Sequence, residues 1–350
     1  MITKKHKATI AAAVMIPALL LGACGKKSDS EGGSTDAKAD TEVSGKIVVS
    51  GSSTVEPISA AVREEFIAQN DQVDIKVDGP GTGDGFKLFC DGETDISDAS
   101  RPIKEEEATA CADKGIEFIE LKIGIDGLSV ITPESDKLEC LSFEDLYSLI
   151  GPESEGVDTW QAAQPLAEEL GSKTEFPDEN LVITGPGAES GTYDSFVEIA
   201  LKGIEETRAE EGKITEDQIG TTRPDYSASP DDNAIIEGVA GDPGGLGWVG
   251  FAFADQAEGV NLVPIAAEAN GDCVAPNPET IQDGSYPLSR DLYIYVNADK
   301  AKSNKALAAF VDFYLEGLDA FVEGADYIPL KDDAATLTTW EDRTTGTQAG

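Results

Sequence analysis

Histidine is almost absent from this chain of 350 residues, and the only one, His6, lies in a basic stretch at the N-terminus. The rest of the sequence therefore cannot form a Ser-His-Asp triad, a Cys-His nucleophile pair or a histidine-based zinc site. We also find no tight Asp cluster that would hold two metal ions. The sequence accordingly predicts neither a metal nor a cofactor.

The N-terminal segment has the organisation of an export signal. Basic residues precede an apolar run over residues 10–21, and two small residues come directly before Cys24. This pattern resembles a bacterial lipoprotein signal, so we expect residues 1–23 to be removed and Cys24 to carry lipid. An uncleaved membrane anchor is the alternative, although the run is shorter than a span requires. Residues 24–44 are mostly small and polar and are expected to form a flexible tether.

Positive charge is scarce. The chain has 26 Lys and Arg against 67 Asp and Glu, a formal net charge of −41. Such a surface repels nucleic acid and anionic lipid, which excludes a nucleic-acid partner or a polybasic membrane contact as the main function. Hydrophobic residues make up 40% of the chain, so it is expected to fold despite its charge. Its length favours two lobes.

Cysteine is also scarce, with five in the chain. Apart from Cys24 these are Cys90, Cys111, Cys140 and Cys273, and an even number in an exported chain predicts two disulfides. Three pairings are possible. We favour Cys90 with Cys111 and Cys140 with Cys273. A zinc site formed by all four is the alternative, but no C-x-x-C motif supports it.

Apolar periodicity predicts alternating strands and helices, which indicates an α/β fold with a largely parallel sheet. The expected strands span residues 46–50, 74–77, 94–97, 117–123, 128–132, 181–184, 245–249 and 292–296. The expected helices span residues 57–70, 83–90, 105–114, 142–150 (capped by Ser142), 190–202, 231–240 and 302–315. Residues 151–180 and 206–230 are acidic and show no clear pattern. Two successive α/β units favour two lobes with a cleft between them.

Three segments share one design, in which a strand leads through a turn of Gly, Ser or Thr into a helix. They span residues 50–57, 79–85 and 184–192. Each places backbone N–H groups and hydroxyl donors at a helix N-terminus, which attracts anions. None is a nucleotide-binding P-loop, because the Gly-Lys-Ser/Thr sequence is missing. Ordinary capped turns without a ligand are the alternative.

A carboxylate, Asp98, is predicted to lie beside these turns. This is favourable only if the anion carries a proton to donate, as phosphate does near neutral pH and sulfate does not. Asp98 is therefore the candidate selectivity residue, and the nearby Arg101 is a candidate cation with a fork of donors. The alternatives are a helix cap or a pair with Arg101 for Asp98, and a surface ion pair for Arg101.

Together these segments resemble the phosphate-binding receptors of bacterial Pst-type phosphate ABC transporters. The matching stretches are residues 50–57, 81–86, 95–103, 185–196, 230–240 and 287–296, within a likeness that covers residues 45–345. The resemblance implies a periplasmic-binding-protein fold of type II with a hinged cleft. It places the first lobe at 45–124 plus 290–345, the second at 125–289, and hinges near residues 124–126 and 289–290.

The same resemblance implies which residues contact phosphate. They are Ser53, Thr54, Val55 (through its backbone N–H), Thr82, Asp98, Ser190, Gly191 and Thr192. Many members of the family also carry an arginine four residues before the serine of the Ser-Gly-Thr motif, where this chain has Pro186. Arg101 is the first candidate to replace that arginine, and Arg223 is the second.

We therefore expect a lipid-anchored, monomeric protein outside the cytoplasm that binds inorganic phosphate and delivers it to the permease of an ABC transporter. We expect no enzymatic activity. The alternatives are a receptor for another oxyanion such as sulfate or molybdate, an exported phosphatase, and a structural or adhesive surface lipoprotein.

Overall fold

The computed structural model describes residues 43–135, 138–188 and 190–347. The predicted signal peptide, Cys24 and all but the last two residues of the predicted tether lie outside this part of the chain, so what the sequence indicates for them stays a prediction. Within the described residues, no helix combines the length and the apolar character needed to cross a membrane.

A nine-stranded mixed sheet organises the described residues, with strand order β2-β1-β3-β11-β4-β8-β6-β7 and β9 paired to β4. Its strands are β1 (Gly45–Gly51), β2 (Val73–Asp78), β3 (Ile96–Ala99), β4 (Phe118–Pro133), β6 (Val182–Gly185), β7 (Ser227–Ala228), β8 (Gly245–Gly250), β9 (Val260–Leu262) and β11 (Ser289–Asn297). A separate pair is formed by β5 (Leu141–Ser142) and β10 (Ile265–Ala266).

Helices connect these strands, as the alternating pattern predicts. The longer ones are α1 (Glu56–Gln69), α2 (Thr82–Cys90), α3 (Glu105–Asp113), α4 (Phe143–Ile150), α5 (Trp160–Glu169), α7 (Lys202–Glu210), α8 (Asp232–Ala240), α12 (Lys305–Glu316) and α14 (Ala334–Glu341). The shorter ones are α6 (Gly191–Phe196), α9 (Phe251–Ala254), α10 (Pro278–Gln282), α11 (Ala298–Ser303) and α13 (Leu318–Gly324). A π-helical segment, η2 (Val197–Leu201), joins α6 to α7, and 3-10 turns lie at η1 (Pro152–Ser154) and η3 (Glu216–Gln218).

The prediction of a largely parallel sheet holds near its two ends and is wrong at its centre. The pairs β1–β2, β1–β3, β6–β8 and β6–β7 are parallel. In contrast, β11 is antiparallel to β3 and β4, and β4 is antiparallel to β8 and β9. The central strands differ because β11 comes from the C-terminal part of the chain and inserts between two earlier strands.

The strands predicted at 117–123 and 128–132 are one continuous strand, β4. The glycines at 124 and 127 lie inside this strand and allow close packing. A Cβ at Gly124 would lie 3.0 Å from Val322, and a Cβ at Gly127 would lie 3.0 Å from Ile281. Glycine inside a strand often marks such a close approach. The predicted helix at 302–315 is, conversely, two helices, because Asn304 ends α11 and caps α12.

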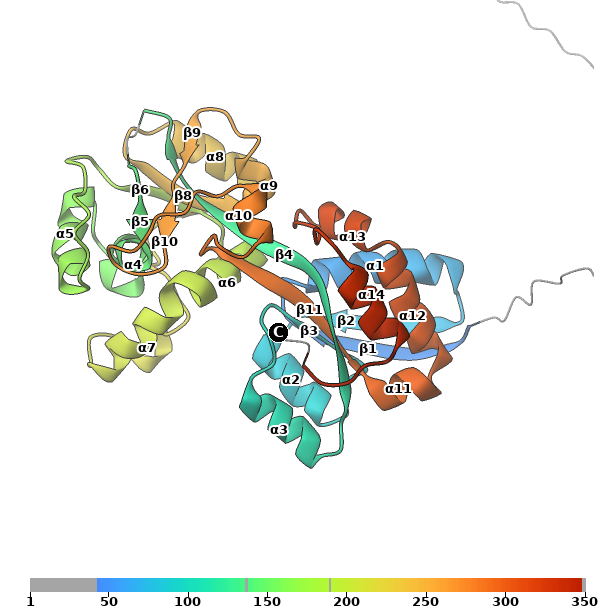
Figure 1. The fold of residues 1–350 in the computed structure, drawn as a ribbon. Helices are drawn as coiled ribbons and strands as arrows, with labels where there is room; N and C mark the ends of the chain where they lie inside the picture. Colours follow the sequence, from blue (N-terminus) through green and yellow to red (C-terminus); the bar gives the residue numbers. More distant parts are fainter. Residues whose placement is uncertain (1–42, 136–137, 189, 348–350) are drawn as a thin grey trace, which may run out of the picture. The chain divides into compact units, whose positions relative to one another are not determined.

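Two large hydrophobic cores divide the described residues. Buried side chains of the first core come from residues 47–123 and 292–340, and those of the second come from residues 125–288. The change occurs within two paired strands, since β4 and β11 run side by side from one core to the other (Figure 1). The two cores thus share a ribbon of two antiparallel strands.

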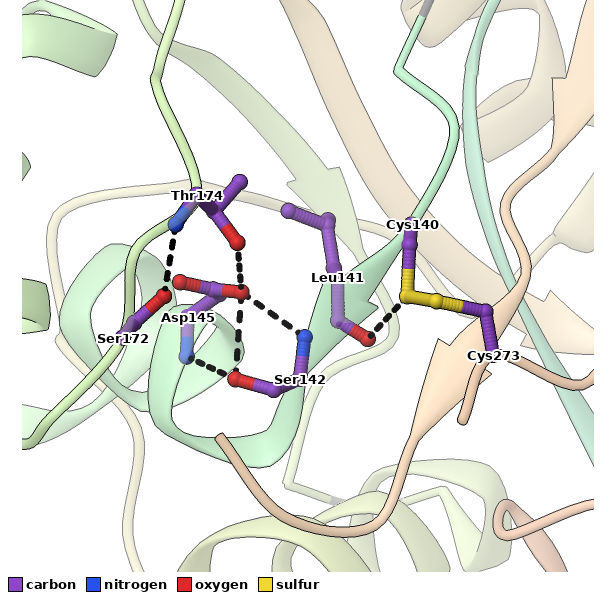
Figure 2. The surroundings of a disulfide bond; sticks show 7 residues. All are labelled: Cys140, Leu141, Ser142, Asp145, Ser172, Thr174 and Cys273. Atoms are coloured by element: carbon purple, nitrogen blue, oxygen red, sulfur yellow. Dashed lines mark hydrogen bonds between the residues drawn. A yellow bond between two sulfur atoms is a disulfide. The ribbon is translucent and has the colours of Figure 1, made fainter. Parts of the chain in front are cut away.

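Both favoured disulfides are present, Cys90–Cys111 and Cys140–Cys273. Figure 2 shows that the second lies beside the start of α4. There Ser142 caps the helix as predicted, by accepting a hydrogen bond from the Asp145 N–H at 3.2 Å. The Asp145 carboxylate in turn accepts hydrogen bonds from the Ser142 N–H at 2.8 Å and from Thr174 Oγ1 at 2.8 Å.

The two disulfides are expected to stabilise the fold unequally. Replacing Cys140 and Cys273 by alanine should lower the free energy of unfolding by about 5 kcal/mol, against about 3 kcal/mol for Cys90 and Cys111. The reason is that the partners are 133 and 21 residues apart, and the longer loop loses more entropy on closure. Urea unfolding of both double variants measures this, and equal losses would contradict the loop-length explanation.

Candidate anion-binding site

The predicted anion loops of the first core lie at one edge of the sheet, because β2, β1 and β3 are parallel neighbours. The loop after β1 leads into α1, and the loop after β2 leads into α2. Val55 and Gly81 occupy the N-cap positions, and among the described residues no side chain caps either helix. N–H groups without side-chain acceptors at helix N-termini favour an anion.

Two glycines allow these segments to approach one another. A Cβ on Gly51, at the end of β1, would lie 2.1 Å from the carbonyl oxygen of Asp98. A Cβ on Gly85, in α2, would lie 2.4 Å from the Gly51 Cα. Any other residue would force the backbones apart. The backbones around Asp98 therefore pack at a distance that only glycine permits.

Asp98 is completely buried, with 0% of its surface exposed. Its Oδ1 accepts a hydrogen bond from Ser59 Oγ at 3.0 Å, whereas its Oδ2 has no partner among the described residues. Burial raises the pKa of this carboxyl to about 7; the Ser59 hydrogen bond lowers that pKa, and the nearby charges of Glu56 and Asp78 raise it. Asp98 can therefore hold or release a proton near neutral pH.

Thr82 and Arg101 both lie near the first turn of α2. Thr82 Oγ1 accepts a hydrogen bond from the Ser100 N–H at 3.2 Å and lies 3.0 Å from the Ser100 Oγ. The Arg101 guanidinium donates to both carboxylate oxygens of Glu107, each at 2.8 Å, and this pairing raises the pKa of Arg101. A Cβ on Gly83 would lie 3.9 Å from Arg101 Nη2. Arg101 is thus near the site with its charge already paired, and its contact with an anion stays a prediction.

The Ser-Gly-Thr segment at 190–192 meets these loops from the other half of the chain. It begins α6, and its serine caps that helix by accepting a hydrogen bond from the threonine N–H at 3.2 Å. A Cβ on the glycine of this segment would lie 3.2 Å from Thr54 Cα. Ser53 Oγ also donates a hydrogen bond to Asp194 Oδ2 at 2.6 Å. Predicted site residues from both halves are therefore in contact.

Arg223, the second candidate cation, is engaged elsewhere. It is 4% exposed, and its guanidinium donates to the Asp225 carboxylate and to the carbonyl oxygens of Leu149 and Val157. These groups belong to segments that pack on the second core. The structure therefore gives Arg223 a structural role and does not support it as the substitute cation.

Sequence reasoning missed Arg290 as a residue of the site. It lies in β11 opposite Asp126 of β4, and its Nε is 3.4 Å from the Asp126 carboxylate. Its Nη2 donates to Thr54 Oγ1 at 2.9 Å and also to Ser195 Oγ. Its Nη1 donates to Glu198. Burial raises the pKa of Asp126. The charge of Arg290 and the hydrogen bond from Ser195 act in the opposite direction and lower that pKa.

A signal for this network was available. Opposite charges stand in the two segments predicted as hinges, 124–126 and 289–290. Neighbouring strands that are largely buried must pair any charge they carry, because an unpaired buried charge is costly. A search for complementary charges in the hinge segments would have found the pair of Asp126 with Arg290.

A cavity of about 530 Å³ adjoins the site. Arg101, Arg290 and Ser100 line it from one side, and residues of η2 and α7 line it from the other. Asp98 and Thr54 do not line this cavity. It therefore adjoins Arg101 and Arg290 and does not enclose the buried carboxyl.

Comparisons with known proteins agree with this architecture. A model of the PBP superfamily domain matches residues 36–317. Protein SphX from Synechocystis sp. is 39% identical over 300 residues, which cover 85% of this chain and 82% of that protein. The phosphate-binding protein PstS from Staphylococcus saprophyticus is 33% identical over 313 residues, covering 89% of this chain and 86% of that one.

Solved structures show the same fold. The crystal structure of a possible phosphate binding protein from Planctomyces limnophilus has a TM-score of 0.76 and 35% sequence identity, and covers 86% of this chain and 99% of that chain. An ABC-type phosphate transport receptor from Vibrio cholerae, at 20% identity and a TM-score of 0.57, supports the fold alone; it covers 81% of this chain and 99% of that chain. The chain belongs to the PBP superfamily, among the PstS and SphX proteins, and has their α/β periplasmic-binding-protein fold.

Replacing Asp98 by asparagine is expected to change how the stability of the ligand-free chain depends on pH. Because the pKa of Asp98 is raised to about 7 from 3.8, the folded chain keeps a proton that the unfolded chain releases in this window. Asp98 therefore lowers stability as the pH rises from about 4 to about 7. When the pH is raised from about 5 to about 8, the free energy of unfolding of Asp98→Asn should fall by about 2–3 kcal/mol less than that of the unaltered chain.

Thermal unfolding at the two pH values measures this difference. Asp74→Asn, which removes an exposed carboxylate from β2, controls for the change in net charge and should behave as the unaltered chain does. Parallel pH profiles for Asp98→Asn and the unaltered chain would show that the pKa of Asp98 is not raised.

Proposed function

We propose that this chain binds inorganic phosphate outside the cytoplasm and delivers it to the permease of an ABC transporter. The observation that carries the proposal is the buried carboxyl of Asp98, with one oxygen unpartnered among the described residues, at an edge where α1 and α2 present their N-termini. Family membership supports it, because curated relatives at 33% identity are named phosphate-binding proteins.

The chemistry of Asp98 suits phosphate better than sulfate. Near neutral pH phosphate carries at least one proton, so it can donate a hydrogen bond to the unpartnered carboxylate oxygen while its other oxygens accept from N–H and hydroxyl groups. Sulfate has no proton to donate and would leave two negative oxygens facing each other. A site built around a required hydrogen bond can reject a ligand that lacks it by about 10⁴-fold.

The remaining ligands are proposed from the loops that surround Asp98. Donors come from the backbone and hydroxyl groups of residues 53–55, from Thr82 and from the segment 190–192. Ser53 contributes through its backbone, because its single hydroxyl proton goes to Asp194. Arg101 lies close enough to α2 to join them if it leaves Glu107.

The lobes are proposed as predicted, with residues 45–124 and 290–345 in the first and 125–289 in the second. The two hydrophobic cores, which divide within β4 and β11, support this boundary. Phosphate would stabilise the closed arrangement, because only that arrangement offers donors from both lobes at once. The contact of Gly191 with Thr54 is the arrangement expected for the closed lobes.

Calorimetric titration with phosphate and with sulfate tests the proposal. The chain without residues 1–24 and without substitutions should bind one phosphate tightly and should not bind sulfate. Asp98→Asn should bind phosphate about 10- to 100-fold more weakly, because an amide N–H replaces an acceptor of the P–O–H proton. The same variant should gain affinity for sulfate, to which that N–H can donate. Asp74→Asn is again the matched control.

Other outcomes would favour the alternatives. Binding of sulfate but not phosphate by the unaltered chain would keep the fold and replace the ligand. Binding of neither, with release of p-nitrophenol from p-nitrophenyl phosphate, would indicate a phosphatase. Binding of neither without hydrolysis would favour a structural surface protein.

The lipid anchor, the monomeric state and the absence of enzymatic activity belong to the same proposal. Expressed in full in a bacterium that processes lipoproteins, the chain should sediment with membranes and incorporate labelled palmitate. Cys24→Ser should abolish both, because no other cysteine follows the small residues 22–23. Membrane association that survives Cys24→Ser would instead indicate an uncleaved anchor.

A further inference from the structure

Arg290 connects four segments of the chain through one guanidinium group. It donates hydrogen bonds to Thr54 in the loop before α1, to Ser195 in α6, to Glu198 in η2 and to Asp126 in β4. One side chain thus bonds the first anion loop and the helix that follows the Ser-Gly-Thr segment. It is only 11% exposed, so water competes little for these hydrogen bonds.

The number of protons determines the direction of each bond. A guanidinium only donates, and a hydroxyl has one proton. Ser195 donates its proton to Asp126 at 2.5 Å and accepts from Arg290. Thr54 also accepts from Arg290, at 2.9 Å, so its own proton is available to another acceptor. Thr54 Oγ1 lies 3.3 Å from Ser195 Oγ, and only Thr54 can donate in this pair because the Ser195 proton goes to Asp126. A hydroxyl hydrogen bond of this length is weak, so an anion beside Thr54 can take over its proton.

We propose that Arg290 is the positioning residue of the phosphate site. By donating to Thr54 it turns the threonine's only hydroxyl proton toward the bound anion, and by donating to Ser195 it holds the start of α6 against the same loop. This inference rests on the proposed function and adds to it a residue that acts through Thr54. It differs from the role predicted for Arg101, which would contact the anion itself.

The charges around Arg290 agree with positioning rather than direct binding. Asp126 is 2% exposed, and together with Glu198 it places two carboxylates against one guanidinium. The positive charge is therefore neutralised locally, and what Arg290 still offers is the fixed direction of its N–H groups. Lysine would keep the charge but could not reach all four acceptors in a planar fork.

Phosphate affinity, measured by calorimetry, tests this role through a double-mutant cycle of Arg290→Gln and Thr54→Val. Arg290→Gln alone should weaken phosphate binding about 10- to 100-fold. In the Thr54→Val background the same change should cost about threefold or less, because the hydroxyl through which it acts is gone. A merely structural loss would show no such coupling. Arg290→Lys should fall between Arg290→Gln and the unaltered chain.

Two controls distinguish the positioning role of Arg290 from a simple loss of positive charge and from a loss of stability. Arg63→Gln removes a positive charge from the middle of α1, where the side chain donates to the carbonyl of Ile75, and should leave phosphate affinity unchanged. Arg290→Gln leaves the buried Asp126 without its cation and lowers stability. If that variant does not fold, Asp126→Asn with Arg290→Gln removes the uncompensated charge and replaces it in the cycle.

Each outcome bears on a distinct claim. If the unaltered chain does not bind phosphate, the proposed function fails and the role of Arg290 within it fails as well. If the unaltered chain binds phosphate and Arg290→Gln binds it equally well, only the role of Arg290 is overturned. An equal loss of affinity with and without the Thr54→Val substitution would also overturn it, because Arg290 would then not act through Thr54.

Discussion

The antiparallel pairing of β4 with β11 is the interaction on which the rest of the structure depends. These two strands carry the chain from one hydrophobic core to the other, and they face each other from Gly127 and Ser289 to Phe118 and Asn297. At the point where the cores divide they also hold Asp126 against Arg290. The same ribbon therefore joins the two halves and supports the polar network beside the candidate site.

The chain has a net charge of −41. It can bind an anion only if the attraction by hydrogen-bond donors at the site is stronger than the repulsion by distant carboxylates. Salt screens charges beyond about 8 Å at physiological ionic strength, so the acidic surface acts weakly on a ligand between the loops. At the candidate site, the groups proposed to contact the ligand are the starts of α1 and α2, which lack a side-chain cap hydrogen bond, and the hydroxyls of Thr54 and Thr82. Burial raises the pKa of Asp98 to about 7, so this carboxyl carries less negative charge near neutral pH than an exposed one.

Much of the fold and the candidate site could be predicted from the sequence, because the signals are local. Helix starts, glycine turns and apolar periodicity located the turns at residues 50–57, 79–85 and 184–192, and the family resemblance implied which residues within them contact the ligand. The direction of β11 and the continuity of β4 could not be predicted, since both depend on pairing between segments far apart in sequence. Arg290 was missed for the same reason: its partners become neighbours only when the halves meet.

The order of segments in the first core has a consequence for how a chain that emerges from its N-terminus can fold. Its buried residues come from both ends of the described part, residues 47–123 and 292–340, while the second core is built from the uninterrupted stretch 125–288. Domains generally fold as units once their residues are present. The residues of the second core are therefore all present first, and the N-terminal strands keep an apolar face uncovered until β11 and α12 have also emerged. The half that begins the sequence is the last to finish folding.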